Sequence, residues 1–204
     1  MKRFIAVFCS FAMIFTFICS TCFAIDFPDV DASHWAFEYI SNLAEKGIIN
    51  GYNDGTFKPS GTVKRSEFLK LVMASVMPED VDPDEIPSTF DHWAAGYVAI
   101  AESYGIIKTG SFTLDNIEKP ITRIEMARIV GNADIIMKSN PISKVSGDDI
   151  LFIDIGNLNA DDLILLEHCA SSGLIKGYED ATFKPDKTMT RAEAATMIYR
   201  FTSK

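Results

Sequence analysis

The sequence has few cysteines and no surplus of positive charge. Only 4 of its 204 residues are cysteine, and three of them, Cys9, Cys19 and Cys22, lie within the first 24 residues. Cys169 alone cannot form an internal disulfide, so the fold must be stabilised by its core. The chain has 19 Lys and Arg against 28 Asp and Glu, a formal net charge of −9. This balance argues against a nucleic-acid-binding protein, which needs basic residues to neutralise phosphates.

The motifs of common enzyme and cofactor sites are also missing. There is no Gly-x-Ser-x-Gly elbow, no phosphate-binding loop, no pair of histidines at metal-binding spacing and, after residue 24, no Cys-x-x-Cys. We therefore predict a protein that is not an enzyme, with no catalytic residue, no metal site and no cofactor. A hydrolase is a distant third hypothesis, after the two that are given at the end of this section. It rests only on the scattered Asp and Glu residues, because glycosidases need just two carboxyl groups.

The N-terminus has the pattern of an export signal. Met1-Lys2-Arg3 is followed by an uncharged, largely apolar run over residues 4–18, and Cys22-Phe23-Ala24 has the small residues that a signal peptidase reads. We predict a signal peptide over residues 1–24, which leaves a net charge of −11 after cleavage. A retained membrane anchor and a lipid-modified Cys22 are the alternatives. No later segment is apolar enough to span a membrane, so no membrane association is expected after cleavage.

The rest of the chain contains one unit three times. Residues 51–59 and 177–185 match at seven of nine positions, and 30 residues separate Trp35 from Arg65 and Trp93 from Arg123. Counting back 30 residues from Arg191 gives Asp161, which replaces the tryptophan in the third copy. The predicted domains are repeats over 25–79, 84–138 and 150–204, with an inserted linker over 139–149.

Each repeat is predicted to form a helix, a loop and a second helix. Apolar residues recur at helical spacing after the tryptophan position and again after the arginine, and Cys169 falls in the first of these stripes, which predicts a buried packing role. Thr122 with Glu125 and Thr190 with Glu193 fit the capping box at the start of the second helix. Lys64 breaks this pattern, so the helix start in the first copy should be weaker or capped in another way.

The repeated arginines and tryptophans are candidate ligand-binding residues. Arg65, Arg123 and Arg191 are expected at the first helical position, where amides without intrahelical partners and the helix dipole favour a carboxylate or phosphate. The alternative is a surface arginine that pairs with a nearby acid. Trp35 and Trp93 suit either stacking on a sugar ring or burial in the core, and position alone does not separate the two.

The order of these motifs resembles the S-layer homology (SLH) domain family, which occurs as three tandem copies on bacterial surface proteins. The elements are Phe27-x-Asp29-Val30, His34-Trp35-Ala36, the glycine-rich run over 47–59 and Thr190-Arg191-Ala192-Glu193. The resemblance implies a mainly α fold, with the three repeats in a pseudo-threefold assembly around a central helical bundle. It also implies grooves between the repeats that bind a secondary cell-wall polysaccharide, often with pyruvylated sugars.

Carried over by position, the resemblance assigns ten residues to carbohydrate binding: Asp29, Trp35, Gly47, Arg65, Trp93, Gly105, Arg123, Asp154, Gly173 and Arg191. Repeat two lacks the Gly-Tyr-x-Asp-Gly loop and repeat three lacks the tryptophan, so the three grooves are not expected to be equal. The predicted function is a secreted module that anchors non-covalently to the cell wall, with an anionic wall polysaccharide as its partner. The alternative is an accessory subunit that binds other surface-layer proteins. The expected location is the cell wall or the cell surface.

Overall fold

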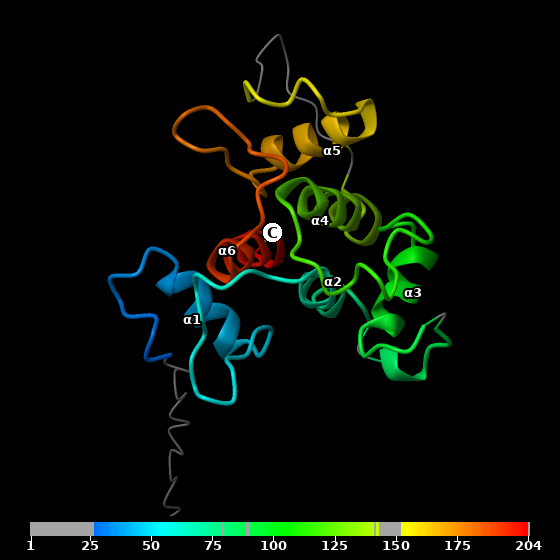
Figure 1. Ribbon diagram of the computed structural model, residues 1–204, viewed down its shortest axis with the longest axis horizontal. Helices are drawn as coiled ribbons and strands as arrows, with labels where there is room; N and C mark the ends of the chain where they lie inside the picture. The colour runs from blue at the N-terminus through cyan, green and yellow to red at the C-terminus, as the bar shows by residue number, and fades with distance from the viewer. Residues whose placement is uncertain (1–26, 79, 89, 141, 143–151, 204) are drawn as a thin grey trace, which may run out of the picture.

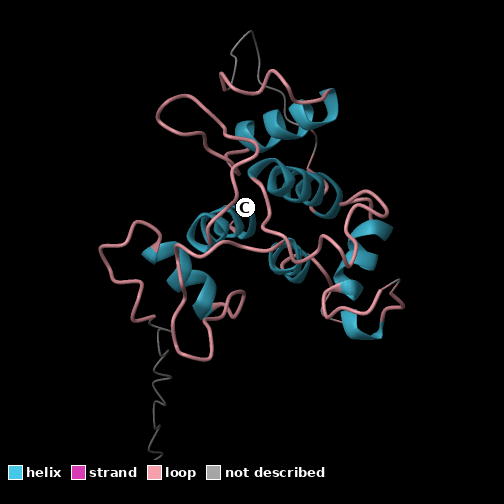
Figure 2. Cartoon of the chain, viewed as in Figure 1, coloured by secondary structure: helices cyan, strands magenta, loops and turns pink. Residues whose placement is uncertain are grey.

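The computed structural model describes residues 27–78, 80–88, 90–140, 142 and 152–203, and in these ranges the chain is mainly helical (Figure 2). The helices are α1 (Phe37–Glu45), α2 (Arg65–Ala74), η1 (Pro83–Glu85, a 3₁₀ turn), α3 (Ala95–Ser103), α4 (Arg123–Met137), α5 (Ala160–Ser171) and α6 (Arg191–Thr202). The described part contains isolated β-bridges but no strand. The predicted mainly α class is therefore confirmed. The predicted signal peptide and residues 143–149 of the linker lie outside the described residues.

Helices α2, α4 and α6 begin at the three motif arginines, as predicted. Two of them have complete capping boxes, in which the hydroxyls of Thr122 and Thr190 accept from the N3 amides and the glutamate carboxylates accept from the threonine amides. At α2 only the return bond is possible, because the Lys64 side chain cannot accept. The Lys64 amide donates to the Glu67 carboxylate at 2.9 Å.

The first helix of each repeat begins and ends through local contacts. The Nδ1 atoms of His34 and His92 accept from the amides two residues later, just before α1 and α3. Gly47, Gly105 and Gly173 end these helices in the left-handed region, with φ of +69°, +75° and +67°. Glycine adopts this conformation without the strain that a Cβ atom brings, which explains its place at all three helix ends.

The helices pair between successive repeats. Helix α3 packs on α2, α5 packs on α4, and α1 packs on α6. The first helix of repeats two and three thus lies against the second helix of the preceding repeat, and that of repeat one lies against the second helix of repeat three. In Figure 1, α2, α4 and α6 lie nearest the centre, and α1, α3 and α5 lie further out. One continuous cluster of buried apolar residues joins all three repeats. None of the helices in the described ranges is long and apolar enough to cross a bilayer.

Backbone hydrogen bonds connect the three repeats in a closed cycle. The amide of Val63 donates to the carbonyl of Met189 at 3.0 Å, Met189 donates to Ile121 at 3.1 Å, and Ile121 donates to Val63 at 2.9 Å. Each of these residues lies two positions before a motif arginine. Equivalent positions of the three repeats therefore meet. The full pseudo-threefold assembly around a central bundle stays a prediction.

The contact between α4 and α5 is close and includes Cys169. This residue is fully buried, and its Sγ lies 3.5 Å from the carbonyl oxygen of Ala127. A Cβ atom added at Gly131 would lie only 3.0 Å from the same Sγ, so the two helices approach as closely as glycine allows. The predicted packing position of Cys169 is confirmed.

Candidate ligand-binding grooves between the repeats

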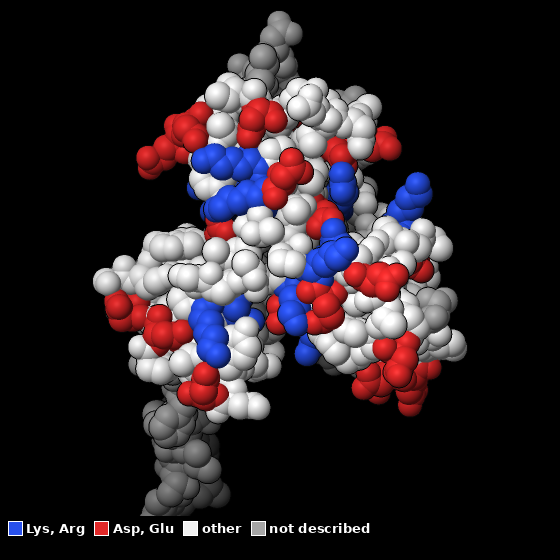
Figure 3. Space-filling view, in the orientation of Figure 1, with Lys and Arg blue, Asp and Glu red and all other residues white. Residues whose placement is uncertain are grey.

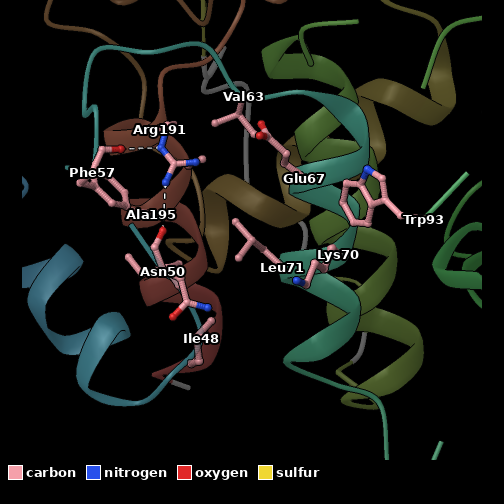
Figure 4. Close-up of a pocket in the computed structure, with 12 residues that line it drawn as sticks. Ile48, Asn50, Phe57, Val63, Glu67, Lys70, Leu71, Trp93, Arg191 and Ala195 are labelled. Carbon is pink, nitrogen blue, oxygen red and sulfur yellow. Dashed lines mark hydrogen bonds between the residues drawn. The ribbon is translucent and has the colours of Figure 1, made fainter. Parts of the chain in front are cut away.

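A cavity with a volume of about 360 Å³ lies between repeats three and one. Its wall combines the start of α6, one side of α2, the loop after α1, and Trp93 from repeat two (Figure 4). Most of the lining is apolar, and three charged side chains are included. The lining residues are Ile48, Ile49, Asn50, Phe57, Val63, Glu67, Lys70, Leu71, Trp93, Arg191, Ala194 and Ala195.

Arg191 is held in this cavity by the loop of repeat one. Its Nε donates to the carbonyl of Phe57 at 2.7 Å, and its Nη2 donates to the carbonyl of Asn50 at 3.2 Å (Figure 4). The rings of Tyr52 and Phe57 lie 4.7 and 4.6 Å from the guanidinium carbon, within cation–π distance. These contacts fix the plane of the guanidinium.

Lys70 and Trp93 lie across the cavity from Arg191 (Figure 4). The Trp93 side chain is 50% exposed, and the Lys70 Nζ lies 5.9 Å from its ring centroid. Among the residues that the structure describes, no carboxylate lies within ion-pair distance of Lys70 or Arg191. The cavity thus presents two cations without an ion-pair partner and one open aromatic face, beside the Glu67 carboxylate, which accepts from the Lys64 amide. The two cations and the ring suit an anionic ligand with an apolar ring surface.

His92 supports the position of Trp93. Its ring lies 5.4 Å from the Trp93 ring, and its Nε2 lies 3.0 Å from a carboxylate oxygen of Glu118. Glu118 also accepts from Lys64 Nζ and from the buried Ser66 hydroxyl. The hydrogen bond from Lys64 lowers the pKa of Glu118, so this carboxylate stays ionised. A ligand that stacks on Trp93 would therefore contact a ring whose position is held by its neighbours.

A second, smaller cavity of about 170 Å³ lies between repeats two and three and includes Trp35 from repeat one, which is 59% exposed. Arg123 is bound here as Arg191 is in the first cavity. Its Nε donates to the carbonyl of Phe183 at 2.6 Å, and its Nη2 donates to the carbonyl of Lys176 at 3.1 Å. Arg123 is only 7% exposed, so little of its guanidinium is open to a ligand. Both tryptophans are exposed at grooves, which rules out the core-filling alternative.

Arg65 has a different partner. Its Nε and Nη2 donate to the two carboxylate oxygens of Glu125 at 3.2 and 2.5 Å, and its Nη1 donates to the carbonyl of Asn116. The sequence left open that the motif arginines pair with nearby acids instead of binding a ligand. Arg65 does pair with an acid, whereas Arg123 and Arg191 bind loop carbonyls. On the face in Figure 3, many Lys and Arg side chains lie near the junctions between the repeats.

Asp29 and Asp154 hold the loops that the arginines contact. The Asp29 carboxylate accepts from the amides of Phe57 and Lys58 at 2.8 and 2.7 Å, and Asp154 accepts in the same way from Phe183 and Lys184. Burial by itself raises the pKa of Asp29, but the two backbone bonds outweigh it and lower the pKa below the ordinary value. Both aspartates support the loops and are bonded within the protein.

The expectation that the helix-start amides are open to an anion is wrong. The amides of Arg65, Arg123 and Arg191 donate to the carbonyls of Lys119, Lys187 and Gly61 in the neighbouring repeat at 2.8–3.0 Å. The next amide of each helix is bonded in the same way, to the carbonyl of Ile117, Pro185 or Pro59. Any anion in these grooves must therefore be bound by side chains.

The cavities bring together only some of the predicted site residues. Arg191 and Trp93 line the first cavity, and Arg123 and Trp35 line the second. Gly47, Gly105 and Gly173 do not line either cavity. Sequence reasoning missed Lys70, because the equivalent positions hold Arg128 and Thr196. A comparison of charge five residues after each motif arginine would have found it.

The comparisons with known proteins point to one family. The family model of the S-layer homology domain matches residues 26–69 and 167–195. An S-layer protein of Bacillus thuringiensis subsp. finitimus is 32% identical over 179 residues, which cover 84% of this chain and 21% of that protein. S-layer protein sap of Bacillus anthracis is 33% identical, with 84% and 20% covered. Cell surface glycoprotein 1 of Acetivibrio thermocellus is 33% identical, with 76% and 7% covered.

The chain spans about a fifth of the length of the two S-layer proteins. The alignments with both proteins cover 84% of this chain. The two segments matched by the family model contain Asp29, Trp35, Arg65 and Arg191. This chain belongs to the S-layer homology domain family.

Proposed function

We propose that this protein is a secreted, non-catalytic module that anchors to the bacterial cell wall or cell surface by binding an anionic wall polysaccharide. The family and the surface-protein relatives support the location and the anchoring role. The observation that carries the ligand class is the first cavity, where Arg191 and Lys70 have no acidic partner among the described residues and Trp93 is exposed beside them.

The ligand that fits this cavity carries a carboxylate next to a sugar ring. Part of the cavity wall is apolar and includes Leu71, Ala194 and Ala195. A pyruvate ketal has both a carboxylate for the cations and a methyl group for this wall. We propose that Trp93 stacks on the sugar and that Arg191 and Lys70 bind the carboxylate. By the same reasoning the second cavity, with Trp35 and Arg123, is a weaker site, since Arg123 is only 7% exposed whereas Arg191 is partly exposed.

A sedimentation assay with purified cell wall tests the function. The protein should co-sediment with intact wall and stay in solution with wall from which the polysaccharide has been removed chemically. Equal binding to both preparations would refute the proposal. Retention that ignores the polysaccharide and survives high salt would instead favour the accessory subunit that binds another surface protein, because a carboxylate contact weakens as salt rises.

A matched pair of variants tests the site. Trp93→Ala should weaken wall binding, since it removes the stacking surface at the rim of the cavity. Tyr104→Ala is the control, because Tyr104 is also an exposed aromatic residue (44%) but does not line the cavity. An equal effect of the two substitutions on wall binding would show that Trp93 has no special role.

A further inference from the structure

The three junctions between the repeats are chemically unequal. At two of them the arginine lies between two aromatic rings, Tyr52 and Phe57 for Arg191, and Tyr178 and Phe183 for Arg123, at 4.6–4.8 Å. Both tyrosines belong to the Gly-Tyr-x-Asp string, which repeat two lacks. Among the described residues, Arg65 therefore has only the ring of Phe112 within cation–π distance, at 5.7 Å.

Without the second ring, the Arg65 guanidinium contacts Glu125. The bond is bidentate, and both side chains are largely shielded from water, with exposed fractions of 17% and 16%. A bidentate pair is the geometry in which guanidinium binds carboxylates most specifically. The protein's own carboxylate thus occupies the guanidinium edge that an external carboxylate would need.

The second cation of this junction is also neutralised. Arg128 is the counterpart of Lys70, five residues after the motif arginine, and it forms a bidentate pair with Asp162 at 2.5 and 2.7 Å. Asp162 stands where the other repeats have Ala36 and Ala94. The adjoining cavity of about 250 Å³ is lined by Glu125, by the paired Arg128 and by Lys108, which has no carboxylate partner among the described residues. The first cavity instead offers both of its cations, Arg191 and Lys70, without such a partner.

We propose that Glu125 is an internal competitor that prevents Arg65 from binding an external carboxylate. The motif arginine of the groove between repeats one and two is thereby withheld from an external carboxylate, and the chain binds carboxylates through Arg191 and, more weakly, Arg123. This inference rests on the proposed function for the nature of the ligand. It adds a specificity-determining residue, Glu125, whose removal should open a further site.

The variant Glu125→Gln tests this directly. Glutamine keeps the steric size and fits the capping box with Thr122, but it offers neither the charge nor the second acceptor that a bidentate pair needs. Pyruvate serves as the carboxylate probe, and ¹H–¹⁵N spectra follow the Nε–H signals of Arg65 and Arg191, assigned with single Arg→Lys variants. We expect pyruvate to shift Arg191 but not Arg65 in the wild type, and to shift both saturably in Glu125→Gln.

Two results would overturn the inference: a saturable shift of Arg65 in the wild type, or no shift of Arg65 in Glu125→Gln. The proposed function fails separately, if Arg191 does not respond in the wild type. A response of Arg65 in the variant together with a silent Arg191 would support the role of Glu125 and contradict the site at Arg191.

Glu193→Gln is the control for capping, because Glu193 is the N3 residue of α6 and bonds Thr190 in the same way. In this variant pyruvate should not shift the Nε–H signal of Arg65. If Glu125→Gln does not fold, Glu125→Asp is the second variant, because its shorter side chain keeps the charge at the helix start but withdraws the carboxylate from Arg65. Pyruvate should then shift Arg65 in that variant, and silence would refute the inference.

Discussion

Arg191→Lys separates the binding role of the motif arginine from its structural role. The substitution keeps the positive charge but removes the planar fork that donates to Phe57 and Asn50. Hydrogen bonds from charged donors contribute about 1.5–3 kcal/mol when buried. Because Arg191 is partly exposed, we take about 1 kcal/mol for each bond and expect lysine to recover part of it, a net loss of about 1–2 kcal/mol.

This loss should be visible in thermal unfolding. In a chain of this size 1 kcal/mol shifts the unfolding midpoint by about 2–4 °C, so Arg191→Lys should lower it by about 2–8 °C. Wall binding should fall as well, by about tenfold or more, since loss of one charge-assisted bond to a ligand carboxylate costs about 1.4 kcal/mol or more. Differential scanning fluorimetry and wall sedimentation of the same preparation measure the two effects.

Arg65→Lys is the matched comparison, because it makes the same change at the junction where Glu125 occupies the guanidinium. It should lower the unfolding midpoint by a similar amount and leave wall binding unchanged. The reasoning is refuted if both variants lose wall binding equally, or if Arg191→Lys keeps the wild-type affinity.

Three further results are expected. Asp29→Asn should lower the free energy of unfolding by about 1–2 kcal/mol near neutral pH. Because the pKa of Asp29 in the folded chain lies below its ordinary 3.8, the stabilisation by its carboxylate is complete above about pH 4 and is lost in stronger acid. The thermal unfolding midpoints of the variant and the wild type should therefore converge in acid. Gly96→Ala should destabilise the fold markedly, since the added Cβ would lie 1.8 Å from the carbonyl oxygen of Pro83, and a normal unfolding midpoint would contradict this. Wall binding should weaken steadily between about 0.05 and 0.5 M salt, because exposed charges are screened more strongly as ionic strength rises; a constant bound fraction in sedimentation would argue against a charged contact.

The sequence predicted well those features that depend on neighbours along the chain. The starts of α4 and α6 follow from Thr122 and Thr190, whose capping partners are only three residues away. The burial of Cys169 follows from its place in a helical stripe, which needs no knowledge of the packing partner.

Features that depend on the neighbouring repeat were beyond such reasoning. The bonds from Arg191 to Phe57 and Asn50 span more than 130 residues, and no local pattern indicates that the loop takes these donors. The pairing of each first helix with a second helix of another repeat could not be predicted from the sequence either, because the apolar stripe of a helix such as α1 suits any apolar partner. The different partner of Arg65 could be anticipated only in part, from the missing Tyr in repeat two.

The closed cycle of backbone hydrogen bonds also constrains the order of folding. Repeats one and two can meet early, through the bond from Ile121 to Val63. The bonds from Val63 to Met189 and from Arg191 to Gly61 join repeat one to repeat three, so they cannot form before the last repeat is present. Contacts of such long sequence separation are costly in chain entropy and form late. As the chain emerges from the ribosome, the packing surface of α1 therefore stays uncovered until α6 is available, and an incomplete chain exposes apolar surface that a complete one buries.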